Sequence, residues 1–162
     1  MIELNTIYNE DCMEGMKRIP DGSVDCIICV LPYGTTRNAW DSVIPLDELW
    51  VQYKRIIKER GAIVLFSQMP FTAILASSNL EMLKYEWIWE KPLATGFLNS
   101  KYAPLKAHEN ILVFSKSAAC FVKDSDDAMV YNPQMRTGKP YFTYRSSSTN
   151  SSNYDYNNIK AC

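Results

Sequence analysis

Residues 24–66 read VDCIICVLPYGTTRNAWDSVIPLDELWVQYKRIIKERGAIVLF, and this stretch decides the fold. It begins with an apolar, partly β-branched run at 24–29 and closes with a second such run, AIVLF, at 62–66. Between the two runs, apolar side chains recur at helical spacing over 46–58, and Gly61 follows as a stop signal. A buried strand, a helix and a second buried strand are typical of a β-α-β unit with parallel strands.

The same alternation continues on both sides of this unit. The patterns predict a strand over 5–9, a helix over 11–18, a helix that opens at Pro70, and strands over 86–90 and 111–114. Strands that alternate with helices of these lengths predict an α/β fold, a three-layer sandwich around a mostly parallel, twisted sheet.

The pattern fails after about Ser115, which divides the chain into three expected regions. The α/β core occupies 1–116, a basic and aromatic region follows at 117–145, and a Ser- and Asn-rich tail completes the chain at 146–162. The tail has too few apolar residues to offset the entropy of ordering it, so we expect it to be flexible unless it is bound.

Length and composition exclude several classes of protein. The chain has 162 residues, 47% of them hydrophobic and 22% charged, as expected of one ordinary globular domain. No window approaches the roughly 20 apolar residues of a membrane span, and the acidic N-terminus lacks an apolar signal core, so we expect a cytoplasmic protein. Cys26 and Cys29 would point to opposite faces of a strand, which favours small core side chains over a metal site.

Charge is distributed unevenly, with 13 acidic and 8 basic residues in 1–90 but 5 acidic and 9 basic residues in 91–162. This asymmetry indicates either a face for an anionic partner such as nucleic acid or an ordinary basic loop region. The candidate DNA-binding residues are Lys91, Lys101, Lys106, Arg136, Lys139 and Arg145. A solvated lysine face, and an aromatic-rich loop that packs back on the sheet, are the alternatives.

The loop after the first buried run, CVLPYGTT at 29–36, is the main candidate for chemistry, because ligands of open α/β sheets bind at the carboxyl ends of strands. Pro32 and Tyr33 can hold a rigid backbone carbonyl beside a flat ring, which suits a planar ligand such as a flipped nucleobase. An ordinary turn is the alternative. Asp41 could contact a base or a phosphate-bound water, or could cap the next segment, and His108 is more typical of a backbone hydrogen bond than of catalysis.

The stretch 24–66, with YEWIWEKPLATGFLNSKYAPLKAHENILVFSK at 85–116 and YNPQMRTGKPY at 131–141, resembles the DNA amino-methyltransferases that modify adenine N6 or cytosine N4. The resemblance is to the branch in which the catalytic motif precedes the cofactor motif, which has many phage-borne members, and it covers residues from about 5 to 145. It implies the catalytic half of a Rossmann-like methyltransferase, S-adenosylmethionine as cofactor, DNA as partner, and a target-recognition role for 117–145.

The resemblance assigns catalytic roles to Leu31, Pro32 and Tyr33. The target base would stack on Tyr33, the Leu31 carbonyl would accept one amine hydrogen, and Pro32 would shape the loop. The family has an acidic or amide residue where this chain has Val30, which accepts no hydrogen bond. Removing one oriented polar group from such a site typically costs about 10²–10³ in rate.

The cofactor site implied by the resemblance is incomplete in this sequence. Asp11 matches the family position that contacts the adenosine moiety, although an acid that stabilises a helix N-terminus is the alternative. None of the six glycines forms the G-x-G turn that this branch carries towards its C-terminus. We therefore expect little or no autonomous activity, with a second copy or another protein covering the missing half. The alternatives are a catalytically silent relative that binds or inhibits another protein, for example in phage counter-defence, and a fragment without an autonomous role.

Overall fold

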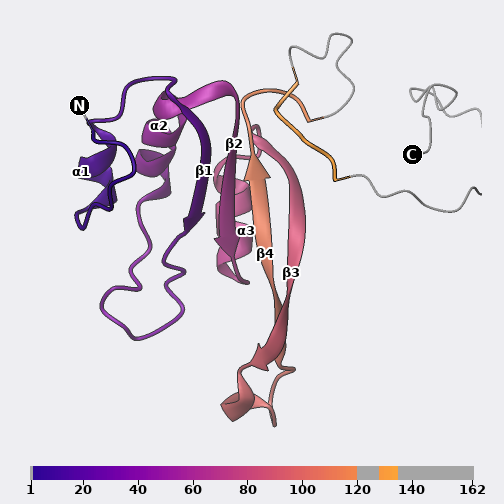
Figure 1. Ribbon diagram of the computed structural model, residues 1–162. Helices are drawn as coiled ribbons and strands as arrows, with labels where there is room; N and C mark the ends of the chain where they lie inside the picture. Colours follow the sequence, from indigo (N-terminus) through magenta and orange to yellow (C-terminus); the bar gives the residue numbers. More distant parts are fainter. Residues whose placement is uncertain (1, 120–127, 135–162) are drawn as a thin grey trace, which may run out of the picture. The chain divides into compact units, whose positions relative to one another are not determined.

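The computed structural model describes residues 2–119 and 128–134. The chain divides into two units, Met1–Val130 and Tyr131–Cys162, and every helix and strand named below belongs to the first. In chain order these are α1 (Cys12–Met16), β1 (Val24–Val30), α2 (Leu46–Ile56), β2 (Ile57–Ser67), α3 (Phe71–Ser78), β3 (Leu83–Thr95), the 3₁₀ helix η1 (Phe97–Asn99) and β4 (Lys106–Phe114) (Figure 1).

The four strands form one sheet in the order β1-β2-β4-β3. β1 is parallel to β2, with Ile27 beside Ile63, whereas β4 is antiparallel to both β2 and β3. Three strands therefore run in one direction and β4 runs against them, so the expectation of a mostly parallel sheet holds for strand direction. Only β1 and β2 are parallel neighbours in the described sheet, because β4 returns from β3 as a hairpin and inserts between β3 and β2.

One hydrophobic cluster joins the sheet to its helices. Trp50 of α2 packs against Phe114 of β4 with 4.8 Å between ring centroids, and its indole N–H donates to Ser78 of α3 at 2.8 Å. All three helices contribute to the cluster, whose buried members are Met16, Leu31, Leu49, Trp50, Tyr53, Ile56, Ile57, Ile63, Leu65, Phe71, Leu75, Met82, Leu112 and Phe114. The α/β class and the likeness to half of a Rossmann-like fold are thus confirmed.

The expected burial of the first strand is wrong, although its position is right. β1 spans Val24–Val30, but Cys26 is exposed, Ile28 is 70% exposed and Val30 is 67% exposed. Only the face of β1 that carries Ile27 and Cys29 packs against the core. An apolar run predicts a strand but does not reveal which of its faces a neighbour covers. Cys26 is therefore not a core side chain, while Cys29 packs on the core as expected.

Three local expectations are also corrected or confirmed. Residues 5–9 form no strand, and Ile7 is 98% exposed, because no described strand lies beside this segment to pair with it. Gly61 does not stop α2, which ends at Ile56; it lies inside β2, where a Cβ atom would come within 2.9 Å of the Asp25 carbonyl. The helix expected at Pro70 is confirmed, with Pro70 as the N-cap of α3.

No described helix has the length and apolarity that crossing a membrane requires.

Candidate functional site

The carboxyl ends of β1, β2 and β3 lie at the same end of the sheet, where the loop 31–45 and the β3–β4 hairpin also lie (Figure 1). This common end follows from the shared strand direction. Ligands of open α/β sheets bind at such an end. The candidate site is therefore built from the residues that follow β1, the residues of β4 and α3 that they contact, and Lys91 of β3, which pairs with Glu109 of β4.

Tyr33 connects the loop after β1 to two other elements. Its ring stacks on Phe71 at the start of α3, with centroids 5.5 Å apart and an interplanar angle of 25°. Its hydroxyl donates to Glu109 Oε2 on β4 at 3.3 Å. Leu31, two residues earlier, is buried in the core, so the loop is anchored on both sides of Pro32.

Glu109 is the centre of a partly buried polar cluster. Its carboxylate forms an ion pair with Lys91 of β3, and the two side chains are only 12% and 17% exposed. The Lys91 ammonium also lies 5.9 Å from the centroid of the Trp89 ring, which in turn meets Phe66 edge-on at 5.9 Å. Both oxygens of Glu109 thus have partners, and the cluster ties β3, β4 and the Tyr33 loop together.

The surroundings of Tyr33 raise the pKa of its hydroxyl well above the usual range. Burial makes the largest contribution, followed by the negative charge of Glu109 and the hydrogen bond to it. The phenol therefore stays protonated at neutral pH and acts as a hydrogen-bond donor. It is not suited to the role of a general base.

Asp41 organises the turn that follows Tyr33. Its carboxylate accepts the backbone N–H groups of Gly34, Thr35 and Thr36 at 2.8, 2.9 and 2.7 Å. A hydrogen bond from the Thr36 side chain, together with these N–H groups, lowers the pKa of Asp41 below its ordinary value. Asp41 thus holds the preceding loop, rather than capping the segment that follows.

Gly34 is required where this turn is tightest. Its φ of +65° lies in the left-handed region, and a Cβ atom there would come within 2.6 Å of Val43 Cγ2. The turn is therefore held both by the carboxylate of Asp41 and by close packing against Val43.

Val30 occupies the position immediately before this loop. It lies beside Phe66 in the register of β1 and β2, on the face that the described helices leave open. Its side chain is exposed and has no polar atom. A ligand at this end of β1 would find the backbone of Leu31 and the ring of Tyr33 but no side-chain acceptor at position 30.

Asp11 lies at a second, separate feature of the fold. Its Oδ1 accepts the Met13 N–H at 2.7 Å and so caps α1, in line with the structural alternative for this residue. The residue also borders a surface hollow of about 440 Å³, whose other lining residues are Cys12, Met13, Glu14, Ser42, Val43, Ile44, Pro45 and Glu48.

One oxygen of Asp11 is engaged within its own helix, and none of the glycines in the sequence forms a G-x-G turn.

The predicted DNA-binding lysines have different environments. Lys91 is engaged with Glu109, as described above. Lys106 is exposed and donates to Gln68 at 3.0 Å, and Lys101 is exposed in the turn after η1. Arg136, Lys139 and Arg145 lie outside the described residues, as does the expected tail at 146–162.

His108 is exposed at the start of β4 and borders a hollow of about 380 Å³. The other residues that line this hollow come from the segment after β2, from the turn before β4 and from β4 itself: Gln68, Met69, Ala103, Pro104, Leu105, Lys106, Ala107 and Asn110.

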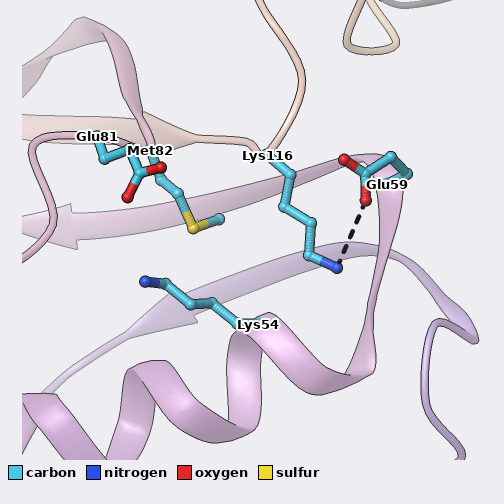
Figure 2. Close-up of a pocket in the computed structure, with 5 residues that line it drawn as sticks. All are labelled: Lys54, Glu59, Glu81, Met82 and Lys116. Atoms are coloured by element: carbon cyan, nitrogen blue, oxygen red, sulfur yellow. Dashed lines mark ion pairs between the residues drawn. The ribbon is translucent and has the colours of Figure 1, made fainter.

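A further hollow, of about 300 Å³, lies among Lys54, Glu59, Glu81, Met82 and Lys116 (Figure 2). Lys116 forms a 3.8 Å ion pair with Glu59 and donates to the Ile57 carbonyl at 3.3 Å. These residues come from the end of α2, the start of β2, the segment just before β3 and the segment just after β4, opposite the carboxyl ends that carry Tyr33. Its two cations and two anions balance, so it shows no preference for a charged ligand.

Within 2–119 and 128–134, no three His, Cys, Asp or Glu side chains gather as metal ligands. Cys26 lies beside Ala62 and Cys29 beside Leu65, so the two thiols are on opposite faces of β1, as predicted from their spacing.

Two residues of the site were not predicted as such from the sequence. The sequence pattern predicts Phe71 as a core residue of a helix, and nothing in the sequence indicates its contact with Tyr33. Glu109 offered a signal, because it is the only acidic residue in the lysine-containing stretch 91–116. A lone carboxylate in such a stretch is a candidate ion-pair partner, but its lysine could be identified only in the fold.

No protein-family model and no curated protein matches the chain. Among solved structures, it is similar to PvuII DNA methyltransferase, described as cytosine-N4-specific, at 13% identity with a TM-score of 0.51, over 68% of this chain and 48% of that one. The M1.HpyAVI–SAM complex gives 22% identity and a TM-score of 0.50, over 67% of this chain and 55% of that one.

TTHA0409 of Thermus thermophilus, a DNA modification methylase by its description, gives 20% identity and a TM-score of 0.50, over 72% of this chain and 54% of that one. The chain thus spans about half the length of these three proteins. At such low identity the similarity shows the fold alone, over about half of each of these proteins.

Proposed function

We propose that the chain is a domain of the DNA amino-methyltransferase family that binds DNA and has little or no autonomous S-adenosylmethionine-dependent activity. The observation that carries the proposal is the Pro32–Tyr33 loop at the carboxyl end of β1, in a fold similar to two proteins described as a DNA methyltransferase and a DNA modification methylase. The motif resemblance through 85–116 adds independent support.

In this proposal a flipped adenine or cytosine lies against the loop after β1. Phe71 covers one face of the Tyr33 ring, and the base stacks on the other. Glu109 and Asp41 do not touch the base; Glu109 holds the Tyr33 hydroxyl and Asp41 holds the turn at 34–36. These contacts orient the ring before a ligand arrives, so less ordering is required on binding.

The missing acceptor at Val30 accounts for the proposed low activity. The Leu31 carbonyl can accept one hydrogen of the target amine, but the second hydrogen finds no partner on the exposed apolar side chain of Val30. The amine nitrogen is then poorly oriented for attack. From the typical effect of one lost polar group, we expect a rate about 10²–10³ lower than with a carboxylate at this position.

S-adenosylmethionine, when bound, supplies the methyl group in this chemistry. Because the sequence contains no G-x-G turn, the proposal assigns the remainder of the cofactor site to a second copy of the chain or to another protein. Asp11 is the proposed contact of this chain, and that role requires its carboxylate to serve both α1 and the ligand.

The second candidate is a catalytically inactive relative that acts through contacts with another protein. The exposed edge and face of β1 favour this candidate. β1 has a strand partner on one side only in the described sheet, and Ile28 and Val30 leave apolar surface beside its free edge. An unpaired edge with exposed apolar side chains is a surface on which another chain can pair. This surface suits either a homodimer or a different protein, including one that the chain would inhibit.

The test is calorimetric titration of S-adenosylmethionine into the purified chain, with and without a DNA duplex, alongside anisotropy of labelled DNA at two salt concentrations. The proposal expects salt-dependent DNA binding, with weak or no cofactor binding by the chain alone. Absence of DNA binding at low salt would reject the proposal in favour of the silent relative. Rapid methyl transfer by the chain alone would contradict the proposed lack of autonomous activity.

A further inference from the structure

The hairpin that joins β3 to β4 forms an arm, defined here as residues 91–106. It extends beyond the ends of β2 and α3 at the same end of the sheet as the loop 31–45 (Figure 1). Large apolar side chains are concentrated on it: Leu93 is 80% exposed, Phe97 77%, Leu98 93% and Tyr102 89%. Single exposed apolar residues are common, but several on one projecting turn indicate an interaction surface.

The tip of the arm is folded without a partner. Gly96 takes a left-handed φ of +91° and leads into η1. The Asn99 carbonyl then accepts the N–H groups of Tyr102 and Ala103 at 2.9 and 3.0 Å. These bonds make a compact turn that presents Phe97 and Leu98 to solvent, so the entropy of ordering the tip is largely lost before it meets a partner.

Charge distinguishes between the partners that such a tip could meet. The arm contains no Asp or Glu and three lysines, of which Lys91 is paired with Glu109, while Lys101 and Lys106 are exposed. Two copies that met tip to tip would bring like charges together. A polyanion, by contrast, gains two phosphate contacts beside the apolar side chains. Apolar side chains that enter a base step beside basic residues are a known means by which proteins unstack and bend duplex DNA.

We propose that the arm is a DNA wedge, in which Phe97 and Leu98 enter a base step of the duplex while Lys101 and Lys106 contact the flanking phosphates. This inference rests on the proposed function, because it assumes that DNA is the partner. The wedge reduces the stacking that holds the neighbouring nucleotide in the duplex, at the end of the sheet where Tyr33 lies. Extrusion of that nucleotide towards Tyr33 then costs less.

The experiment uses the full chain and a duplex that carries 2-aminopurine, whose fluorescence increases when the base is unstacked. The variant is Phe97→Ala with Leu98→Ala, and the matched control is Leu80→Ala, which removes a 68% exposed leucine far from the arm. We expect the double variant to lose the fluorescence increase and to bind DNA about tenfold more weakly, as for the loss of one stacked contact. The control should behave as wild type, and urea unfolding should show equal stability for all three proteins.

A second variant separates the wedge from simple electrostatic attraction. Lys101→Ala should make the plot of log affinity against log salt concentration less steep, reducing the magnitude of its slope by about 0.9. The fluorescence increase at saturating protein should remain. If wild type binds DNA but the double variant matches it in both affinity and fluorescence, Phe97 and Leu98 do not enter a base step. The wedge proposal is then wrong, and the proposed function stands. If wild type binds no DNA at low salt, both are wrong. A change in sedimentation of the double variant without a change in DNA binding would assign the arm to self-association and overturn the wedge.

Discussion

The Tyr33 hydroxyl donates a hydrogen bond to Glu109, 76 residues later in the chain, across 3.3 Å. Glu109 in turn pairs with Lys91, and Tyr33 stacks on Phe71. The candidate loop after β1 is thus held by β4, β3 and α3 together. Changes at Glu109 should therefore affect the loop even though this residue lies on another strand.

Removal of Glu109 should destabilise the chain more than removal of the Tyr33 hydroxyl. Tyr33→Phe deletes one hydrogen bond, which is worth about 1 kcal/mol. Glu109→Gln removes the charge opposite Lys91 and leaves a mostly buried ammonium without its counter-ion, a loss of about 2–3 kcal/mol. Urea unfolding of both variants measures the two values. Equal losses would show that the Lys91–Glu109 pair contributes little.

The turn held by Asp41 should loosen in acid. The pKa of Asp41 is lowered in the folded chain from the ordinary 3.8, so the ionised form favours the folded turn. Its contribution is complete above the ordinary pKa and is lost as the pH falls through the lower folded value. The protection of the Gly34, Thr35 and Thr36 amides against hydrogen exchange, measured relative to an unfolded peptide at the same pH, should fall over that range. Asp41→Asn should show fast exchange at neutral pH, and unchanged protection in this variant would disprove the role of the carboxylate.

The two faces of α2 should respond differently to truncation. Leu49 is fully buried in the cluster between α2 and the sheet, whereas Val51 is 63% exposed on the same helix. Leu49→Ala should cost about 2–5 kcal/mol through lost burial and the cavity left behind. Val51→Ala should change stability by no more than about 0.5 kcal/mol. Thermal unfolding distinguishes the two, and similar losses would contradict the packing of α2 described here.

Val30→Asp should restore the missing acceptor without unfolding the chain, because Val30 lies exposed at the end of β1. Where a cofactor site is completed by a second copy or another protein, methyl transfer should rise by about 10²–10³. Transfer of labelled methyl groups to DNA measures the change, with Val30→Leu as the control that adds no acceptor. Unchanged transfer beside demonstrated cofactor binding would refute this account of Val30.

The sequence by itself predicted the local elements, because side-chain periodicity reflects local geometry. The apolar run at 24–29, the helical spacing over 46–58 and the run at 62–66 predicted β1, α2 and the buried part of β2. The turn residues after β1 likewise indicated the candidate loop. These features depend on neighbours a few residues away, so they can be read without the fold.

The tertiary structure decided what lies beside each element. β4 inserts between β2 and β3, which brings Glu109 within reach of Tyr33 and Lys91. The core cluster packs against only one face of β1, the face of Ile27 and Cys29, so Ile28 and Val30 on the other face are exposed, although their pattern matches that of a buried strand. Burial and long-range pairing arise from contacts between segments distant in the sequence, and one sequence pattern is compatible with several such arrangements.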